Sequence, residues 1–180
     1  MGQQQIGCSI TGLPGFPVEN VTLQNIRIEF LGGGTLEDAA REIPERPDAY
    51  PSCRMFAALP AYGFFVRHVK NIVFRNVDLS FEHDDYRPAM IFDDVADLEL
   101  SGFDAQSVPS TAGGLIWMRQ TAGARIHGCR LTRKTRTFLR VDGEKSADIC
   151  LMNNDLTRAE KIVEAGSDVA ADAVRLENNP

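Results

Sequence analysis

The hydrophobic and polar positions of this chain repeat as a short phrase. An apolar residue, any residue, a second apolar residue and any residue are followed by Asn or Gly, as in VTLQN at 21–25 and IVFRN at 72–76. The phrase starts at Val21, Ile72, Leu98, Ala124, Ile149 and Val174, so the first step is about twice as long as the later, nearly equal ones. Its fifth position holds Asn25, Asn76, Gly102, Gly128, Asn153 and Asn178.

This phrase has the pattern of a short strand followed by a sharp bend. Apolar residues two apart bury one face of a strand, and Asn and Gly enter the left-handed backbone region at low cost. Further strand-like segments precede the phrases at 62–68, 88–94, 115–120, 137–143 and 161–166. The sequence therefore predicts an all-β fold, a right-handed parallel β-helix of about 25 residues per coil, with the six Asn and Gly residues in one stacked column.

A leucine-rich repeat has a similar period, but its Asn follows a Leu by three positions rather than two. The long first step, from Val21 to Ile72, does not contain a second phrase. We interpret it as one coil with a long loop excursion at about 31–60. A short helix is expected at 35–41, with Thr35 as its cap and Glu37 and Asp38 in its first turn.

The composition of the chain narrows the classes of function that it can have. The 180 residues carry a net charge of −6, which disfavours non-specific binding to nucleic acid or to anionic membranes. No apolar run approaches a membrane span, and the first residues lack the pattern of a signal peptide. The four Cys form no Cys-x-x-Cys pair and the three His are scattered, so we expect no metal or cofactor. Cys129 and Cys150 occupy different registers, so we expect no disulfide between them.

Two stretches of the sequence resemble a known protein family. They are GLPGFPVENVTLQNIRI at 12–28 and a longer stretch at 32–77 that contains LPAYGFFVRHVKNI. They resemble the C-terminal part of polygalacturonase-like proteins, glycoside hydrolase family 28, which are pectin-degrading right-handed parallel β-helices. The resemblance covers about residues 6–106. It implies hydrolysis of galacturonides by paired carboxyl groups, and it implies a secreted or periplasmic location, although the sequence itself leaves the location open.

The family's Asn-Thr-Asp, Gly-His-Gly and Arg-Ile-Lys motifs are absent. Asp-Asp occurs at 84–85 and 93–94. In the family the catalytic Asp pair comes before the segment that this chain resembles, whereas both pairs here come after it. We therefore predict one β-helix domain over 1–180, partial relative to the family, that lacks the catalytic coils and has no catalytic residue. The alternatives are a non-catalytic carbohydrate-binding or structural β-helix, and a fragment completed by a partner chain.

Tyr62, Arg67 and His68 are the candidate substrate-binding residues, for an acidic polysaccharide such as a pectic oligosaccharide. Arg67, His68 and Lys70 form a basic cluster in an acidic chain, the Arg fork suits a uronate carboxylate, and Tyr62 could stack on a sugar. The competing interpretation is that Arg67 pairs with acids of the loop and that Tyr62 packs the excursion down. The Asp pair at 84–85 and the basic run at 130–140 are interpreted as solvated turns, and the pair at 93–94 as a turn with side-chain-to-backbone bonds.

The first coil raises the question of self-association. An uncovered strand edge around Leu23 and Ile26 invites pairing with another chain, so we expect a homodimer through the N-terminal edge of the β-helix. Alternatively, residues 3–10 fold back as a partial strand and cover this edge.

Overall fold

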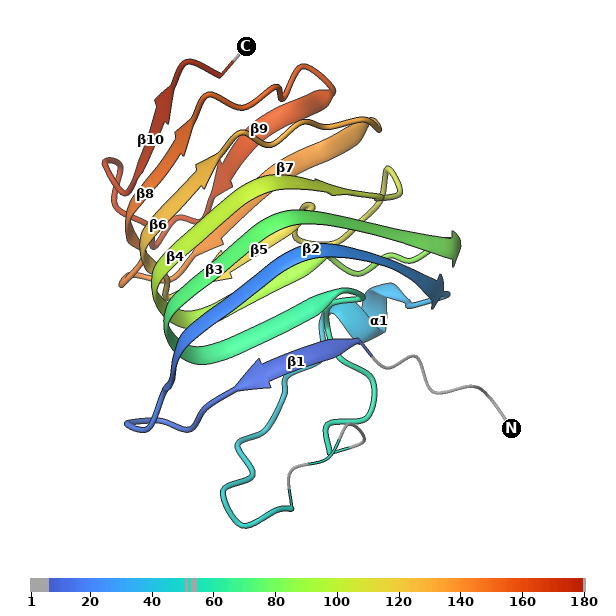
Figure 1. Cartoon of the computed structure of the whole chain (residues 1–180), viewed down its shortest axis with the longest axis vertical. Coiled ribbons are helices and arrows are strands. Elements are labelled where there is room, and N and C mark those ends of the chain that lie inside the picture. The colour runs from blue at the N-terminus through green and yellow to red at the C-terminus, as the bar shows by residue number, and fades with distance from the viewer. Residues whose placement is uncertain (1–6, 51, 53–54, 180) are drawn as a thin grey trace.

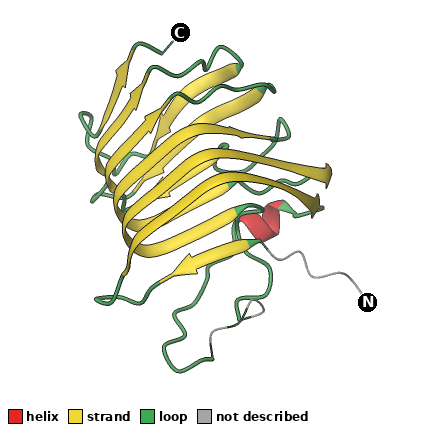
Figure 2. Ribbon diagram, viewed as in Figure 1, coloured by secondary structure: helices red, strands yellow, loops and turns green. Residues whose placement is uncertain are grey.

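The chain folds as a parallel β-helix in which strands stack coil upon coil (Figure 1). The computed structural model describes residues 7–50, 52 and 55–179. Figure 2 shows that strands dominate the described chain and that one short helix lies beside them. The elements are β1 (Cys8–Thr11), β2 (Val18–Gly32), α1 (Leu36–Ala39), β3 (Phe64–His83), β4 (Met90–Ala105), β5 (Ile116–Arg119), β6 (Ala122–His127), β7 (Thr135–Asp142), β8 (Ala147–Met152), β9 (Ala159–Ala165) and β10 (Val174–Glu177).

The pairing of neighbouring coils follows the phrase of the sequence. Val21 of β2 lies opposite Ile72 of β3, and Ile72 lies opposite Leu98 of β4. The same parallel register continues through Ala124 and Ile149 to Val174. Because β2 pairs directly with β3, the long first step of the repeat is one coil plus an excursion. The predicted β-helix and its excursion are confirmed.

Residues in the left-handed region bend each coil. The six residues at the fifth position of the phrase all have positive φ, between 51° and 61°, and Nδ2 of Asn76 donates to Oδ1 of Asn25. The predicted column is therefore confirmed. Two further columns of positive φ frame the other strands; they are Asn20, Asn71, Asp97, Gly123 and Asp148, and His68, Asp94, Gln120 and Gly143.

The inward positions of the coils form the core. Phe74 lies edge-on to Phe64 of the same strand at 5.2 Å and to Phe92 of β4 at 5.9 Å between ring centroids, so aromatic rings cross the core of one coil and contact the next. All three side chains are buried. Burial of such rings is the main source of stability in a stack of short strands.

The excursion is anchored at both ends by a buried ion pair. Asp85 accepts from Arg87 at 2.6 Å, and both side chains are almost fully buried. At the start of the excursion, Gly34 N donates to Asp85; near its end, the carbonyl of Leu59 accepts from Arg87. The expectation that the pair at 84–85 is a solvated turn is wrong for Asp85, because Arg87 and the excursion replace the water around its carboxylate.

The excursion also contains the expected helix and covers part of the outer face. Thr35 caps α1 in a reciprocal capping box with Asp38, as predicted, although the helix is shorter than 35–41. Apolar side chains of the excursion pack on outward-facing residues of the coils, in a cluster of Ile43, Leu59, Ala61, Phe65 and Ile91 with Phe56 and Trp117 at its edge. No helix of the described residues has the length and apolar character needed to cross a membrane.

Candidate functional site

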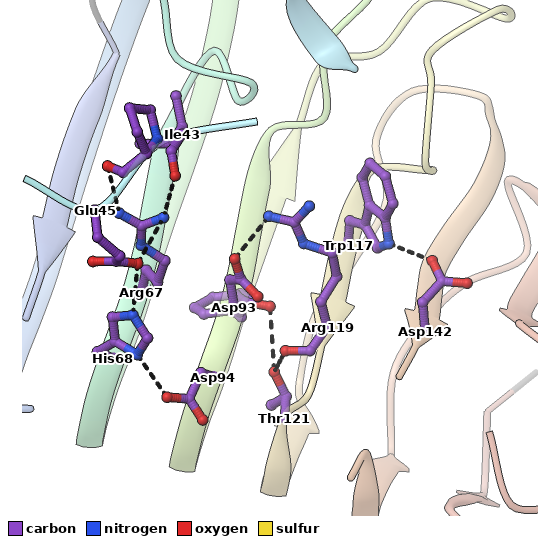
Figure 3. A network of polar contacts seen from close by, with 12 residues as sticks. Ile43, Glu45, Arg67, His68, Asp93, Asp94, Trp117, Arg119, Thr121 and Asp142 are labelled. Carbon is purple, nitrogen blue, oxygen red and sulfur yellow. Dashed lines mark hydrogen bonds and ion pairs between the residues drawn. The ribbon is translucent and has the colours of Figure 1, made fainter. Parts of the chain in front are cut away.

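Four charged side chains of alternating sign cross the outer face of the β-helix in one row. Arg67 of β3 lies opposite Asp93 of β4, Asp93 opposite Arg119 of β5, and Arg119 opposite Asp142 of β7. Figure 3 shows these side chains on neighbouring strands. Because adjacent strands are about 4.8 Å apart, the alternation places opposite charges next to each other.

Arg119 is at the centre of this row and is held on two sides. Its Nη2 donates to Asp93 at 2.9 Å, and its guanidinium carbon lies 5.2 Å from the centroid of the Trp117 ring. The side chain is 28% exposed. A guanidinium has five N–H donors, and the bond to Asp93 occupies one of them. Arg119 is thus a positioned cation with donors left for a ligand.

Trp117 connects Arg119 with the next coil. Its indole N–H donates to Asp142 at 2.5 Å, and Asp142 also accepts from Nε of Arg140 at 2.7 Å. The Arg140 guanidinium lies 5.0 Å from the Trp117 centroid. The hydrogen bond to Asp142 raises the pKa of Arg140. Trp117 therefore contacts two guanidinium groups, which orients them along the face.

Arg67 holds the excursion against the same face. Its Nη1 donates to the carbonyl of Ile43 at 2.5 Å and lies 3.1 Å from the Glu45 carboxylate, while Nη2 reaches the carbonyl of Pro44 at 3.4 Å. Its side chain is only 8% exposed. Among the described residues, the buried side-chain polar atoms without a hydrogen-bond partner are Nε of Arg67 and Nε of Arg119.

His68, the next residue, lies between two carboxylates. Its Nδ1 is 2.6 Å from Asp94 of β4, and its Nε2 is 3.0 Å from Glu45 of the excursion. Burial alone would lower the pKa of His68, but the hydrogen bonds to Glu45 and Asp94 outweigh it and raise the pKa above its ordinary value of 6.5.

The row opens into a hollow of about 380 Å³, which we name the Arg119 groove. It is lined by Glu42, Ile43, Arg67, Asp93, Arg119, Gln120, Asp142, Gly143 and Asp168. The lining carries four carboxylates against two guanidinium groups, so hydrogen-bond acceptors outnumber fixed cations. A ligand that presents several donors, and at most one acidic group to each arginine, matches this surface.

The opposite outer face has a hollow of about 390 Å³. Arg125, Cys150 and Arg175 follow one another there on β6, β8 and β10. No aromatic side chain lines that hollow, and no buried side-chain N–H without a partner lies there among the described residues. We therefore take the Arg119 groove as the candidate site.

The structure places only some of the predicted substrate-binding residues at the groove. Arg67 lines the groove and His68 adjoins it, but Arg67 also pairs with the loop acid Glu45, as its competing interpretation expected. Tyr62 is wrong as a stacking platform: it is 1% exposed, its ring lies edge-on to Phe30 and Phe81, and its hydroxyl donates to the carbonyl of Gln106. Its ring belongs to the core because its position in the coil points inward.

Trp117, Arg119 and Asp142 are the residues that sequence reasoning missed. Arg67, Asp93 and Arg119 occupy the same place before successive phrases, and this periodicity was a usable signal. Asp142 follows Arg119 at a shorter interval, because the intervening coil is shorter. Asp94 lies at a bend, with a φ of 56°, but the predicted bonds to backbone are replaced by ion pairs of Asp93 with Arg119 and of Asp94 with His68.

The remaining sequence candidates do not line the groove. In the basic run, Arg130 lies 3.7 Å from Asp155, and Arg133 lies 4.0 Å from both Asp78 and Asp104. Cys129 is buried in the core, whereas Cys150 faces the opposite hollow. Within the described residues, His, Cys, Asp and Glu do not gather into groups of three or more that could hold a metal ion.

Fold and groove together define the class: a parallel β-helix protein with a polar groove on its outer face. Compared with protein-family models, with curated proteins and with solved structures, the chain matches none of them. A function must therefore be proposed from the chemistry of the groove.

Proposed function

We propose that the chain is a carbohydrate-binding part of a polygalacturonase-like β-helix, and that it holds a pectic oligosaccharide in the Arg119 groove without cleaving it. The observation that carries the proposal is the row of Arg67, Asp93, Arg119 and Asp142, in which charged acceptors and donors alternate from strand to strand. Rigid strands hold all four side chains, so little ordering is needed when a ligand binds.

The excess of carboxylates selects for hydroxyl groups. Asp93, Asp142, Asp168 and Glu42 supply acceptors around the groove, and ionised carboxylates accept hydrogen bonds but donate none. A sugar ring presents several hydroxyl donors on one rigid frame. A fully ionised inorganic anion such as sulfate presents only acceptors, so it offers these carboxylates no hydrogen bond.

Arg119 supplies the complementary interaction for an acidic sugar. A uronate has one carboxylate per ring, which the planar guanidinium binds with charge-assisted hydrogen bonds. The choice of a pectic sugar rests on the resemblance at 12–28 and 32–77. The volume of about 380 Å³ suits a small part of such a polymer.

Binding without cleavage follows from how the carboxylates are used. Inverting hydrolysis needs one carboxylic acid to protonate the leaving oxygen and a carboxylate to activate water. Asp93 is paired with Arg119, and Asp142 accepts from Arg140 and Trp117. These contacts make both carboxylates positioned acceptors, and the family's catalytic motifs are absent from the sequence.

Isothermal titration with trigalacturonate and with galactotriose tests the proposal. Arg119→Gln should weaken trigalacturonate binding by about tenfold or more, because it removes a charge-assisted interaction. Arg125→Gln on the opposite face is the matched control and should bind like the original protein. Equal binding by both variants would remove Arg119 from the site. Absence of binding to either sugar would overturn the proposed function.

A further inference from the structure

One wall of the Arg119 groove is a short strap of the excursion, residues 42–45. Glu42 and Ile43 line the groove directly. Arg67 holds the carbonyls of Ile43 and Pro44, and Glu45 is held by both Arg67 and His68. The position of this wall therefore depends on two adjacent residues at the end of one strand segment of β3.

The two carboxylate contacts of His68 can both be hydrogen bonds only in one protonation state of its ring. A neutral imidazole has one N–H and one lone pair, whereas the protonated ring donates from both nitrogens. Glu45 and Asp94 both present carboxylate oxygens to the ring, on opposite nitrogens. Only the protonated ring donates to both, so loss of the proton leaves a lone pair facing one carboxylate.

We propose that His68 is a proton-operated latch, which holds the strap against the groove while it is protonated and loosens it when the proton leaves. The proposal rests on the proposed function and deepens it, because it makes sugar binding in the groove depend on pH. An arginine keeps its charge in proteins, so the Arg67 contacts persist and the change is confined to the Glu45 end of the strap.

The charges around His68 support this direction. Glu45 faces it from the excursion and Asp94 from β4, and both stabilise the protonated ring. Arg67 shares Glu45, and Lys70 and Lys145 line the adjoining hollow with His68, which works against protonation. From the chain that follows β1, Leu13 and Gly15 face this hollow, and neither residue type titrates.

The sign of the effect follows from the pKa. The pKa of His68 is raised above 6.5 by Glu45 and Asp94, against the effect of burial. The latch is therefore fully formed below pH 6.5 and is lost as the pH rises through the pKa of the folded protein. Sugar affinity should fall over the same interval, by about fivefold or more.

Two readouts report the strap without any ligand. Trp117 is the chain's one tryptophan and packs at the edge of the cluster that contains Ile43, so its fluorescence should change when the strap loosens. Hydrogen-exchange protection factors for 42–46, measured from pH 5.5 to 8.5, should fall with the same midpoint. Titration with trigalacturonate over that range then measures the coupling to binding.

The variants are chosen to preserve the backbone. His68 has a φ of 52°, so His68→Asn keeps a residue that tolerates this conformation. His127→Asn is the control, because His127 is on the opposite face, 3.7 Å from Glu99. Glu45→Gln changes a partly exposed residue and should move the transition to lower pH, which tests the latch even if His68→Asn folds poorly.

The expected result is a transition in the original protein and in His127→Asn that disappears in His68→Asn. A flat profile in the original protein, or an unchanged transition in His68→Asn or Glu45→Gln, would overturn the latch. A transition without sugar binding at any pH would overturn the proposed function and leave the latch supported. Sugar binding whose affinity does not change across this pH range would overturn the latch and leave the proposed function supported.

Discussion

Nδ2 of Asn76 donates a hydrogen bond to Oδ1 of Asn25 at 3.0 Å, although the two residues are 51 positions apart in the chain. Both have positive φ, and Gly102 follows them in the next coil with a φ of 61°. The bond therefore joins the equivalent bends of two neighbouring coils. Asn71 and Asn20 make the same contact at the neighbouring bend, at 2.7 Å.

Gly102→Ala should destabilise the protein more than Gly128→Ala. Both glycines have a φ of 61°, so each Ala costs about 1–2 kcal/mol for the left-handed backbone. At Gly102 a Cβ would also meet Asn76 Oδ1 at 2.7 Å, whereas at Gly128 it meets nothing within 4 Å. Urea denaturation should show the difference, about 1 kcal/mol. Equal losses would mean that the Asn76 side chain moves aside freely.

Asp85→Asn should destabilise the fold strongly, because it leaves Arg87 buried without its carboxylate. Both side chains are at most 2% exposed, and the pair ties Gly34 and Leu59 to the coils. The expected loss is about 3–5 kcal/mol of unfolding free energy. Arg27→Gln breaks an exposed pair with Asp78 and should change stability by less than about 1 kcal/mol. Comparable losses in the two variants would refute a special role for the buried pair.

The isolated chain should not hydrolyse polygalacturonate. Asp93 and Asp142 of the groove are engaged by Arg119, Arg140 and Trp117, and no pair of carboxylates matches the family's catalytic motifs. A reducing-sugar assay on purified protein should stay at background. Turnover that disappears in Asp93→Asn or Asp142→Asn would contradict this and make the groove an active site.

The protein should self-associate through its first coil. In the described chain, β1 and β2 pair with β3 on one side and have no strand on their other edge, and Val21, Leu23 and Ile26 are only half-buried there. Open strand edges pair readily with other chains. Light scattering at micromolar concentration should give about twice the mass of one chain, 19.8 kDa.

A monomeric mass would instead favour the alternative in which residues 3–10 fold back and cover the edge of the first coil. Part of that alternative, residues 3–6, lies outside the described residues. Within its remainder, Cys8 and the residues after it form β1, which pairs with β3 as a strand of the first coil. This strand extends the coil and does not lie over the edge of β2.

The sequence by itself determined the architecture, because a solenoid repeats the same local physics in each coil. Apolar residues two apart need a buried face, and Asn25, Asn76 or Gly102 at the bend needs a left-handed backbone. These requirements are local, so they can be read directly once in every coil. The other two columns of bends were missed because their residue types vary: one mixes Asn, Asp and Gly, and the other mixes His68, Asp94, Gln120 and Gly143.

The groove was decided by the tertiary structure. Whether an aromatic residue faces inward or outward depends on its register in the coil: Tyr62 packs in the core, whereas Trp117 faces Asp142. The position of Glu45 and the contact of Asp85 with Gly34 depend on where the excursion lies, and an irregular loop has no period to reveal this. Charges from four separate coils become neighbours only when the strands stack, so their shared surface cannot be recognised from any single coil.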